Sequence, residues 1–105
     1  MPRWLSNVLK RIHEFAAAGE VRLTYKTQRE GLLLGLSPED VRDVTAGLGA
    51  EDSAGRLVSE TTGEWMYAFK PDVGGQIIYV KLVLRENCVV VSFHEDEGGG
   101  YEEDE

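Results

Sequence analysis

The sequence predicts an α+β domain in which helices pack on one face of an antiparallel sheet. Apolar residues recur at steps of three and four up to about residue 48, a spacing typical of helices, and alternate with polar residues after residue 55, as in strands. The 105 residues suffice for one hydrophobic core and are too few for two domains. We therefore expect one domain over residues 1–94, with a helix, a strand and two helices followed by four strands.

The first predicted helix spans residues 4–18 and stops at Gly19, a residue type common just after helix ends. Its apolar residues form one stripe along the helix: Leu5, Val8, Leu9, Ile12, Phe15 and Ala16. Residues 21–25 alternate apolar and polar side chains of types favoured in strands. This pattern predicts a short strand at or near an edge of the sheet.

Two further helices are predicted before the main part of the sheet. Residues 26–36 place three leucines between polar residues and end near Gly35, which favours a short helix. The next helix runs from Pro38 to Ala46, because Ser37 is a good N-cap and proline is favoured at the first helical position.

Four strands are predicted in the second half of the chain, over residues 56–60, 64–70, 76–85 and 88–94. The connections between them are short, and the tightest is the Glu86-Asn87 turn. Short connections of this kind join antiparallel neighbours, so we expect the four strands to form a meander.

The net charge of −8 comes from 19 acidic and 11 basic residues that are unevenly distributed. Seven of the acidic residues lie in residues 95–105, so residues 1–94 carry 12 acidic and 11 basic residues and a charge of −1. Three consecutive glycines interrupt the acidic stretch. This composition predicts a disordered tail over residues 95–105 and a nearly neutral folded body.

Several classes of protein and site are disfavoured. No segment approaches the roughly 20 consecutive apolar residues of a membrane-spanning helix. Cys88 is the single cysteine and cannot form an intramolecular disulfide, and no signal-peptide pattern is seen, so we expect a cytoplasmic protein. The two histidines lie 81 positions apart and give no metal-binding signature, and no glycine cluster has phosphate-loop spacing. We expect neither a metal ion nor another cofactor.

Strand periodicity places Tyr79 and Lys81 on the more exposed face of residues 76–85, because the opposite face of that strand is largely apolar and must be core. Simple alternation divides the last strand into two sets: Cys88, Val90, Ser92 and His94 on one face, and Val89, Val91 and Phe93 on the other. Lys70 and His94 would join Tyr79 and Lys81 on one surface if the strand registers allow it.

Such a surface would suit RNA cleavage, in which a ribose 2'-OH attacks its own phosphate and the enzyme supplies a base, an acid and positive charge. His94 is the first candidate for proton transfer, because its ordinary pKa is near neutrality. Lys81, Lys70 and Arg56 would hold phosphate, and Tyr79 would stack a base or donate a proton. Each residue also has a structural interpretation, since strand lysines are commonly solvated charges and tyrosines commonly pack.

Several short stretches along the chain resemble one known family. They are FAAAGEVRLT at residues 15–24, LGL leading to VTAGL within residues 34–48, and YVKL at residues 79–82 with VSF at residues 91–93. Together they are similar to the MqsR (motility quorum-sensing regulator) toxin family, from about Leu5 to His94. The resemblance implies a RelE-like fold and a toxin of a type II toxin–antitoxin system, which cleaves single-stranded mRNA without the ribosome and is neutralised by a cognate antitoxin.

The resemblance also implies roles for individual residues. The strand tyrosine of the family corresponds to Tyr79, and the lysine two places later corresponds to Lys81. Lys70, which stands before Pro71, matches a basic residue that is an arginine in the family. Arg56 is the expected equivalent of a family lysine in the loop before the first meander strand.

Two positions depart from the family pattern. Met66 follows Trp65 where the family has a glutamine, and His94 follows Ser92 and Phe93 where the family has a lysine. The first change removes a hydrogen-bonding group, and the second replaces a fixed charge with a titratable one that still serves as an acid or a base.

The expected site therefore has two parts and contains no metal ligand. The catalytic residues would be Tyr79, His94, Lys81 and Arg56, and the RNA-binding residues would be Lys70, Arg85 and Met66. A non-catalytic RelE-like protein that inhibits a host factor by docking its sheet is the alternative, and an inactive relic or antitoxin-like partner is a third possibility.

Overall fold

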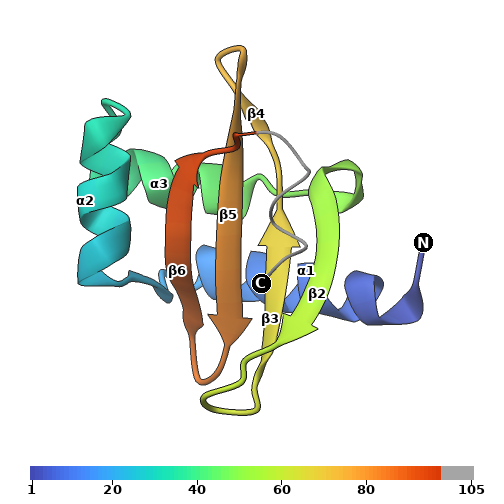
Figure 1. Cartoon of the computed structure of the whole chain (residues 1–105). Coiled ribbons are helices and arrows are strands. Elements are labelled where there is room, and N and C mark those ends of the chain that lie inside the picture. Colours follow the sequence, from blue (N-terminus) through green and yellow to red (C-terminus); the bar gives the residue numbers. More distant parts are fainter. Residues whose placement is uncertain (98–105) are drawn as a thin grey trace.

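The computed structural model describes residues 1–97 and has an α+β architecture of three helices and a mixed sheet (Figure 1). Its elements are, in chain order, α1 (Arg3–Ala17), β1 (Val21–Leu23), α2 (Tyr25–Leu33), α3 (Pro38–Ala46), the 3₁₀ turn η1 (Ala50–Asp52), β2 (Ser53–Val58), β3 (Trp65–Phe69), β4 (Asp72–Val73), β5 (Gln76–Leu84) and β6 (Cys88–Glu95). The predicted fold class and order of helices are confirmed.

The strands are arranged in the order β1-β6-β5-β3-β2, with the two-residue β4 paired to β5. The pairs β2-β3, β3-β5 and β5-β6 are antiparallel, so the predicted meander is confirmed. The short strand β1 lies at the edge, as expected, and runs parallel to β6. Sequence reasoning missed β4, which forms within the short connection between the second and third predicted meander strands.

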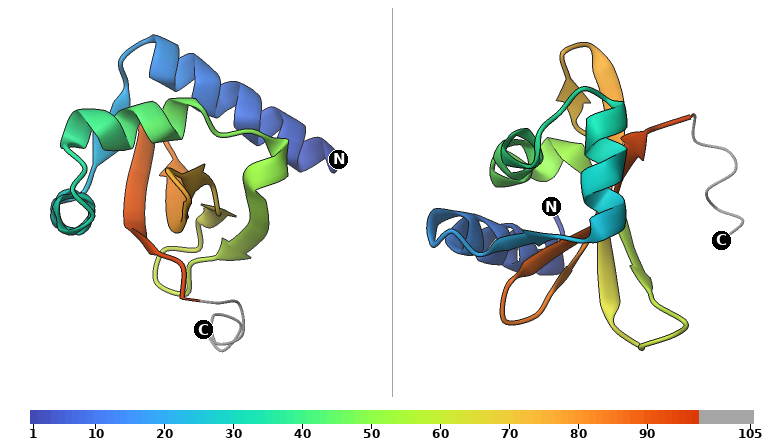
Figure 2. Two further views of the ribbon diagram at one scale, coloured as in Figure 1. Left: turned by 90° about the horizontal axis from the view of Figure 1, so that it is seen from above. Right: turned by 90° about the vertical axis from the view of Figure 1, so that its left-hand side faces the viewer.

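The helices leave one face of the sheet open. α1 and α3 cover one face, whereas α2 stands at the sheet edge beside β6 (Figure 2). Within residues 1–97 no helix covers the opposite face, which we call the open face. None of the helices described is both long and apolar enough to span a membrane.

Local sequence signals explain where the helices begin. Ser37 accepts a hydrogen bond from the Asp40 amide while the Asp40 carboxylate accepts one from the Ser37 amide, which forms a capping box before α3. The Thr24 hydroxyl accepts from the amide of Thr27 and starts α2. Gly19 follows α1 with φ of +72°, a conformation that glycine adopts without strain.

The core lies between the sheet and helices α1 and α3. Its largest fully buried side chains include Ile12 of α1, Val41 of α3, and Phe69, Leu82 and Phe93 of the sheet. Burying one side chain of this kind contributes about 1.5–3 kcal/mol. One face of the sheet therefore packs on the core, and the open face does not.

A β-bulge in β6 overturns the simple alternation expected for that strand. Lys81 pairs with Ser92 but Leu82 pairs with Val90, so Val91 is an extra residue without a partner in β5. One extra residue exchanges the faces of everything beyond it. Cys88 and Val90 before the bulge therefore face the core. After the bulge Phe93 faces the core, and Ser92 and His94 lie on the opposite face.

The first meander strand also differs from its prediction. β2 starts at Ser53 instead of residue 56, and its register against β3 shifts between Ser53 and Arg56. Gly55 lies in this irregularity with φ of +101°. Arg56 is paired with Tyr67, whose ring packs against the core, so both residues face the helices.

Candidate functional site

Three neighbouring strands bring the predicted site residues together on the open face. Tyr79 of β5 is opposite His94 of β6, and Lys81 lies between Ala68 of β3 and Ser92 of β6. Residues two apart on a strand lie about 6.6 Å apart, so Tyr79 and Lys81 are near neighbours on this face. The prediction that His94, Tyr79 and Lys81 share one surface agrees with this geometry, although it requires the bulge.

Tyr79 and His94 form a stacked pair at the centre of the site. Their ring centroids are 5.3 Å apart and the ring planes are inclined by 27°. The His94 Nδ1 atom lies 3.1 Å from the carbonyl oxygen of Glu95. A carbonyl oxygen only accepts hydrogen bonds, so Nδ1 donates in this contact, which leaves Nε2 as the ring atom with a lone pair in the neutral imidazole.

Lys81 has small neighbours on both sides. Ala68 and Ser92 are its cross-strand partners, and neither side chain is long enough to cover an ammonium group at the end of a lysine. Lys81 is half-buried as a residue, and lysines commonly bury the stem while the ammonium reaches solvent, where it can bind phosphate.

Lys70 adds a second positive charge at the end of β3. Its amide donates to the carbonyl oxygen of Asp52 at 2.7 Å, which fixes the backbone as the chain leaves the strand. Its ammonium lies 3.5 Å from the Asp96 carboxylate, and the side chains are 30% and 11% exposed. Asp96 therefore offsets part of the Lys70 charge. Glu95 is part of β6, Asp96 and Glu97 follow it within the described residues, and residues 98–105 of the predicted acidic tail lie outside them.

Lys26 is a further lysine beside this group that sequence reasoning did not single out. Its ammonium donates to the Val91 carbonyl oxygen at 3.2 Å and to the Ser92 hydroxyl at 3.1 Å, and it lies 3.2 Å from the Glu30 carboxylate. The second Glu30 oxygen accepts from the Phe93 amide at 2.8 Å. The only signal in the sequence was the four-residue spacing of Lys26 and Glu30, typical of a helical ion pair.

Arg56 does not join this group. Its guanidinium carbon lies 4.0 Å from the ring centroid of Trp65 and 4.7 Å from that of Trp4 in α1. Trp4 also stacks on Tyr67 at 5.9 Å. The residue thus joins the first turn of α1 to β2 and β3 on the helix side of the sheet.

Arg85 and Met66 lie away from the centre of the site. The Arg85 guanidinium makes two hydrogen bonds, of 2.7 and 2.8 Å, to the Glu64 carboxylate. Hydrogen bonds from Arg85 lower the pKa of Glu64 to about 2, and the same pair raises the pKa of Arg85. Met66 lies on the open face in β3, where its thioether offers only a weak acceptor.

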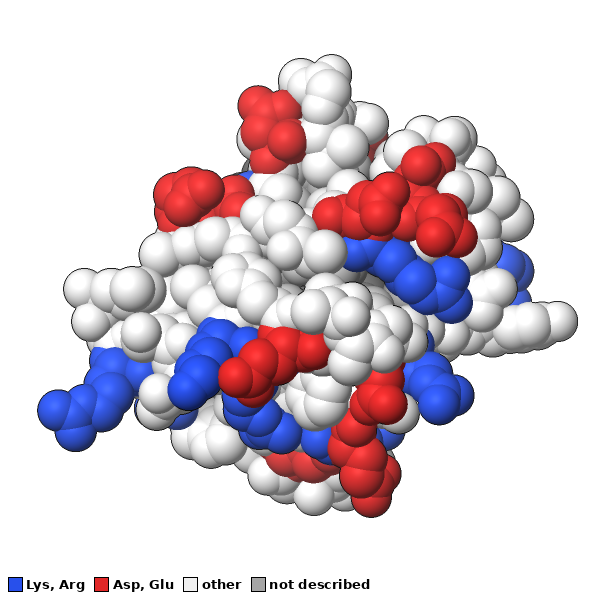
Figure 3. Space-filling view, turned by 180° about the vertical axis from the view of Figure 1, so that it is seen from behind, with Lys and Arg blue, Asp and Glu red and all other residues white. Residues whose placement is uncertain are grey.

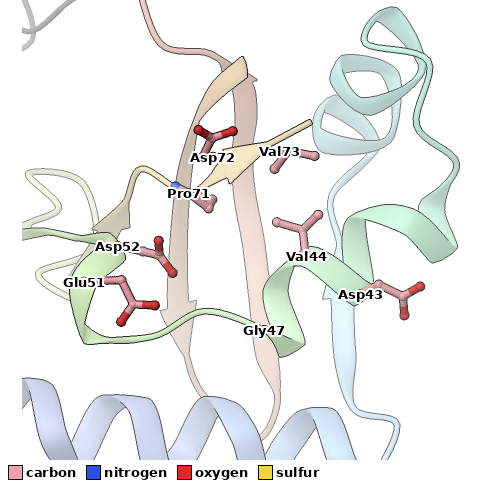
Figure 4. A pocket seen from close by; sticks show the side chains of 8 residues that line it. All are labelled: Asp43, Val44, Gly47, Glu51, Asp52, Pro71, Asp72 and Val73. Carbon is pink, nitrogen blue, oxygen red and sulfur yellow. The ribbon is translucent and has the colours of Figure 1, made fainter. Parts of the chain in front are cut away.

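A groove on another part of the surface has the wrong charge for RNA. It has a volume of about 400 Å³ and lies between α3, η1 and the start of β4 (Figure 4). Its lining is Asp43, Val44, Gly47, Glu51, Asp52, Pro71, Asp72 and Val73. Four carboxylates repel phosphate. No cluster suited to a metal ion is found among the residues described.

The helix-covered face carries side chains of both charges. Acidic side chains crowd its upper part in Figure 3, and lysine and arginine side chains are interspersed with acidic ones below. A surface of such mixed charge has no continuous positive track for a phosphate backbone. The open face is therefore the better candidate for binding RNA.

Cys88 does not provide a nucleophile. Its side chain is fully buried, and burial raises the pKa of the thiol to about 12. The expectation of an inert core or boundary cysteine agrees with this environment. His13 is exposed on α1 and donates from Nε2 to the Leu48 carbonyl oxygen at 2.8 Å, as a boundary residue would.

Comparison with known families gives one match over most of the chain. The model of the family described as "Motility quorum-sensing regulator, toxin of MqsA" matches residues 6–95. No curated protein matches the chain. The matched segment contains the described strands β1 to β6, with Tyr79, His94, Lys81 and Lys70.

Proposed function

Because the chain belongs to the MqsR (motility quorum-sensing regulator) family and is thus a toxin of a toxin–antitoxin system, we propose that it is an endoribonuclease acting on single-stranded mRNA. The observation that carries this proposal is the stacked Tyr79–His94 pair beside Lys81 and Lys70 on the open face. A cognate antitoxin is its partner, and the cytoplasm, where mRNA is translated, is its proposed place of action.

The proposed reaction forms a bond between the ribose 2' oxygen and phosphorus and breaks the bond from phosphorus to the 5' oxygen. His94 Nε2 takes the proton of the 2'-OH, and the Tyr79 phenol donates a proton to the departing 5' oxygen. The products are a 2',3'-cyclic phosphate and a 5'-OH. His94 then releases its proton to solvent, and the Tyr79 phenolate takes a proton from solvent.

The two lysines stabilise the negative charge that develops on the phosphate during this step. The phosphorane carries more negative charge than the starting phosphodiester, so a positive group beside it stabilises the transition state more than the ground state. Lys81 lies two residues from Tyr79 on β5, and Lys70 follows Phe69, the cross-strand partner of Val80, on the β3 side of Tyr79. This chemistry requires no metal ion or other cofactor.

The direct test is cleavage of a long mRNA by the purified protein in EDTA, with the 5' ends mapped. Tyr79→Phe, Lys81→Ala and His94→Ala should each reduce cleavage at least about tenfold. Lys10→Ala is the matched control, because Lys10 is an exposed lysine on α1, behind the sheet. Recurrent cleavage at a short sequence, lost in the three variants, supports the proposal.

One outcome would favour the alternative of a non-catalytic binding protein. If the protein arrests growth but does not cleave RNA, the toxin acts by docking on a host factor. Met66 then becomes the first position to change, since Met66→Gln restores the polar group that the family carries at this point.

A further inference from the structure

Resting on the proposed function, we propose that Lys26 of α2 is an RNA-contacting residue of this site. The RNA strand would then cross the open face at a large angle to the β-strands, from Lys70 over Lys81 to Lys26. The helix α2 would thereby be a part of the substrate-binding surface as well as a support at the sheet edge.

Lys26 is held at the border of the open face by three contacts. Its ammonium bonds the carbonyl oxygen of the bulge residue Val91, the hydroxyl of Ser92, and the carboxylate of Glu30. Ser92 is the cross-strand partner of Lys81. Since neighbouring strands are about 4.8 Å apart, Ser92 separates the two lysines by roughly one strand.

The charge of Lys26 is accessible. Its side chain is 55% exposed, whereas Glu30 is 18% exposed and has its other oxygen occupied by the Phe93 amide. An exposed ion pair between residues four apart on a helix is weak, so a phosphate oxygen can replace Glu30 as the partner of the ammonium. The contacts to Val91 and Ser92 would meanwhile keep Lys26 oriented.

Other positive side chains are less suited to this position. Arg85 is engaged by Glu64 at the far end of the open face, and Arg56 lies on the opposite face between two tryptophans. Lys26, Lys81 and Lys70 thus form a row that crosses β6, β5 and the end of β3. A row of single charges with this spacing follows a phosphate backbone without reading its sequence.

The competing explanation is that Lys26 only stabilises the bulge by satisfying the Val91 carbonyl. The salt dependence of RNA binding separates the two roles, because each phosphate neutralised on a single strand contributes about 0.7 to the slope of log K against log salt concentration. A purely structural lysine would change the stability and leave that slope alone.

The experiment measures binding of a labelled single-stranded oligonucleotide made uncleavable by 2'-O-methyl groups, over a series of KCl concentrations. Lys26→Gln should lower the magnitude of the slope by about 0.7 and weaken binding severalfold at low salt. Lys81→Gln should behave alike, Lys10→Gln should match the wild type, and Lys26→Arg should retain the slope because it retains the charge. Melting curves of all variants accompany the titrations.

The outcomes separate this inference from the proposed function. An unchanged slope in Lys26→Gln, with a reduced slope in Lys81→Gln, overturns the role of Lys26 and leaves the ribonuclease proposal standing. A wild-type protein that neither binds nor cleaves RNA overturns both. In cleavage assays Lys26→Gln should raise KM severalfold and leave kcat nearly unchanged, because Lys26 is separated from the Tyr79–His94 pair.

Discussion

His94 stacks on Tyr79 because Val91 adds one residue to β6 before His94 is reached. The ring centroids are 5.3 Å apart, and the two residues are direct partners across the β5-β6 ladder. Without the extra residue, strict alternation would turn His94 toward the core side occupied by Cys88 and Val90. The bulge therefore assembles the candidate site, a role that bulges often have beside active sites.

Deleting Val91 should destabilise the protein by about 3–5 kcal/mol. Phe93 is fully buried, and losing the extra residue exchanges its face with that of its neighbours, at a cost similar to that of removing a buried phenylalanine. Urea unfolding measures the difference. Val91→Ala is the matched control, since it keeps the residue count and should cost about 1 kcal/mol. Equal stabilities of the two variants would contradict the proposed importance of the bulge.

Arg56→Ala should leave RNA cleavage within about twofold of the wild type and reduce stability by roughly 1 kcal/mol. The guanidinium packs on Trp4 and Trp65 on the helix side, and exposed cation–π contacts contribute about 0.5–1 kcal/mol each. Cleavage assays test the first expectation, and urea unfolding monitored by tryptophan fluorescence tests the second. A tenfold loss of cleavage with unchanged stability would restore Arg56 to the catalytic group.

Asp96→Asn should tighten RNA binding by up to about fivefold at low salt. The Asp96 carboxylate lies 3.5 Å from the Lys70 ammonium and opposes any phosphate that approaches it. The same titration on Asp43→Asn, in the acidic groove beside α3, serves as the control for a general change in net charge. If both variants bind equally better, the effect comes from net charge and not from the local pair.

The Glu64–Arg85 pair should contribute stability at neutral pH that is lost on acidification. The pKa of Glu64 is about 2 in the folded protein, below the ordinary value of 4.5, so the unfolded chain binds the proton first as the pH falls. The stability difference between wild type and Glu64→Gln should shrink from pH 4.5 toward pH 2. Melting temperatures of both proteins across that range test it, and a constant difference would argue against the pair.

Cys88 should react with a thiol reagent only when the protein unfolds. Its side chain is fully buried and burial raises the pKa of the thiol to about 12, so the reactive thiolate is scarce at pH 8. The rate of modification by a disulfide reagent, with and without denaturant, measures this protection. Fast labelling of the native protein would show that the β1-β6 edge opens readily.

Local patterns in the chain were enough to predict the helices, the meander and the edge strand. Helical and alternating periodicities are properties of neighbouring residues, and the Ser37-Pro38 start of α3 follows from capping chemistry alone. The fold class and the open side of β5 follow from the same patterns. Tyr79 and Lys81 could be placed on one face because they stand two residues apart on a regular strand.

Contacts between distant segments settled the rest of the site. The unpaired Val91 in β6 turned His94 toward Tyr79, the pairing of Arg56 with Tyr67 placed Arg56 on the side of Trp4, and the packing of α2 on β6 brought Lys26 beside Ser92. A one-residue offset in pairing changes a side chain from one face to the other, and nothing in the local sequence encodes it. The pairing of strands in the folded sheet therefore decides which residues meet at the site.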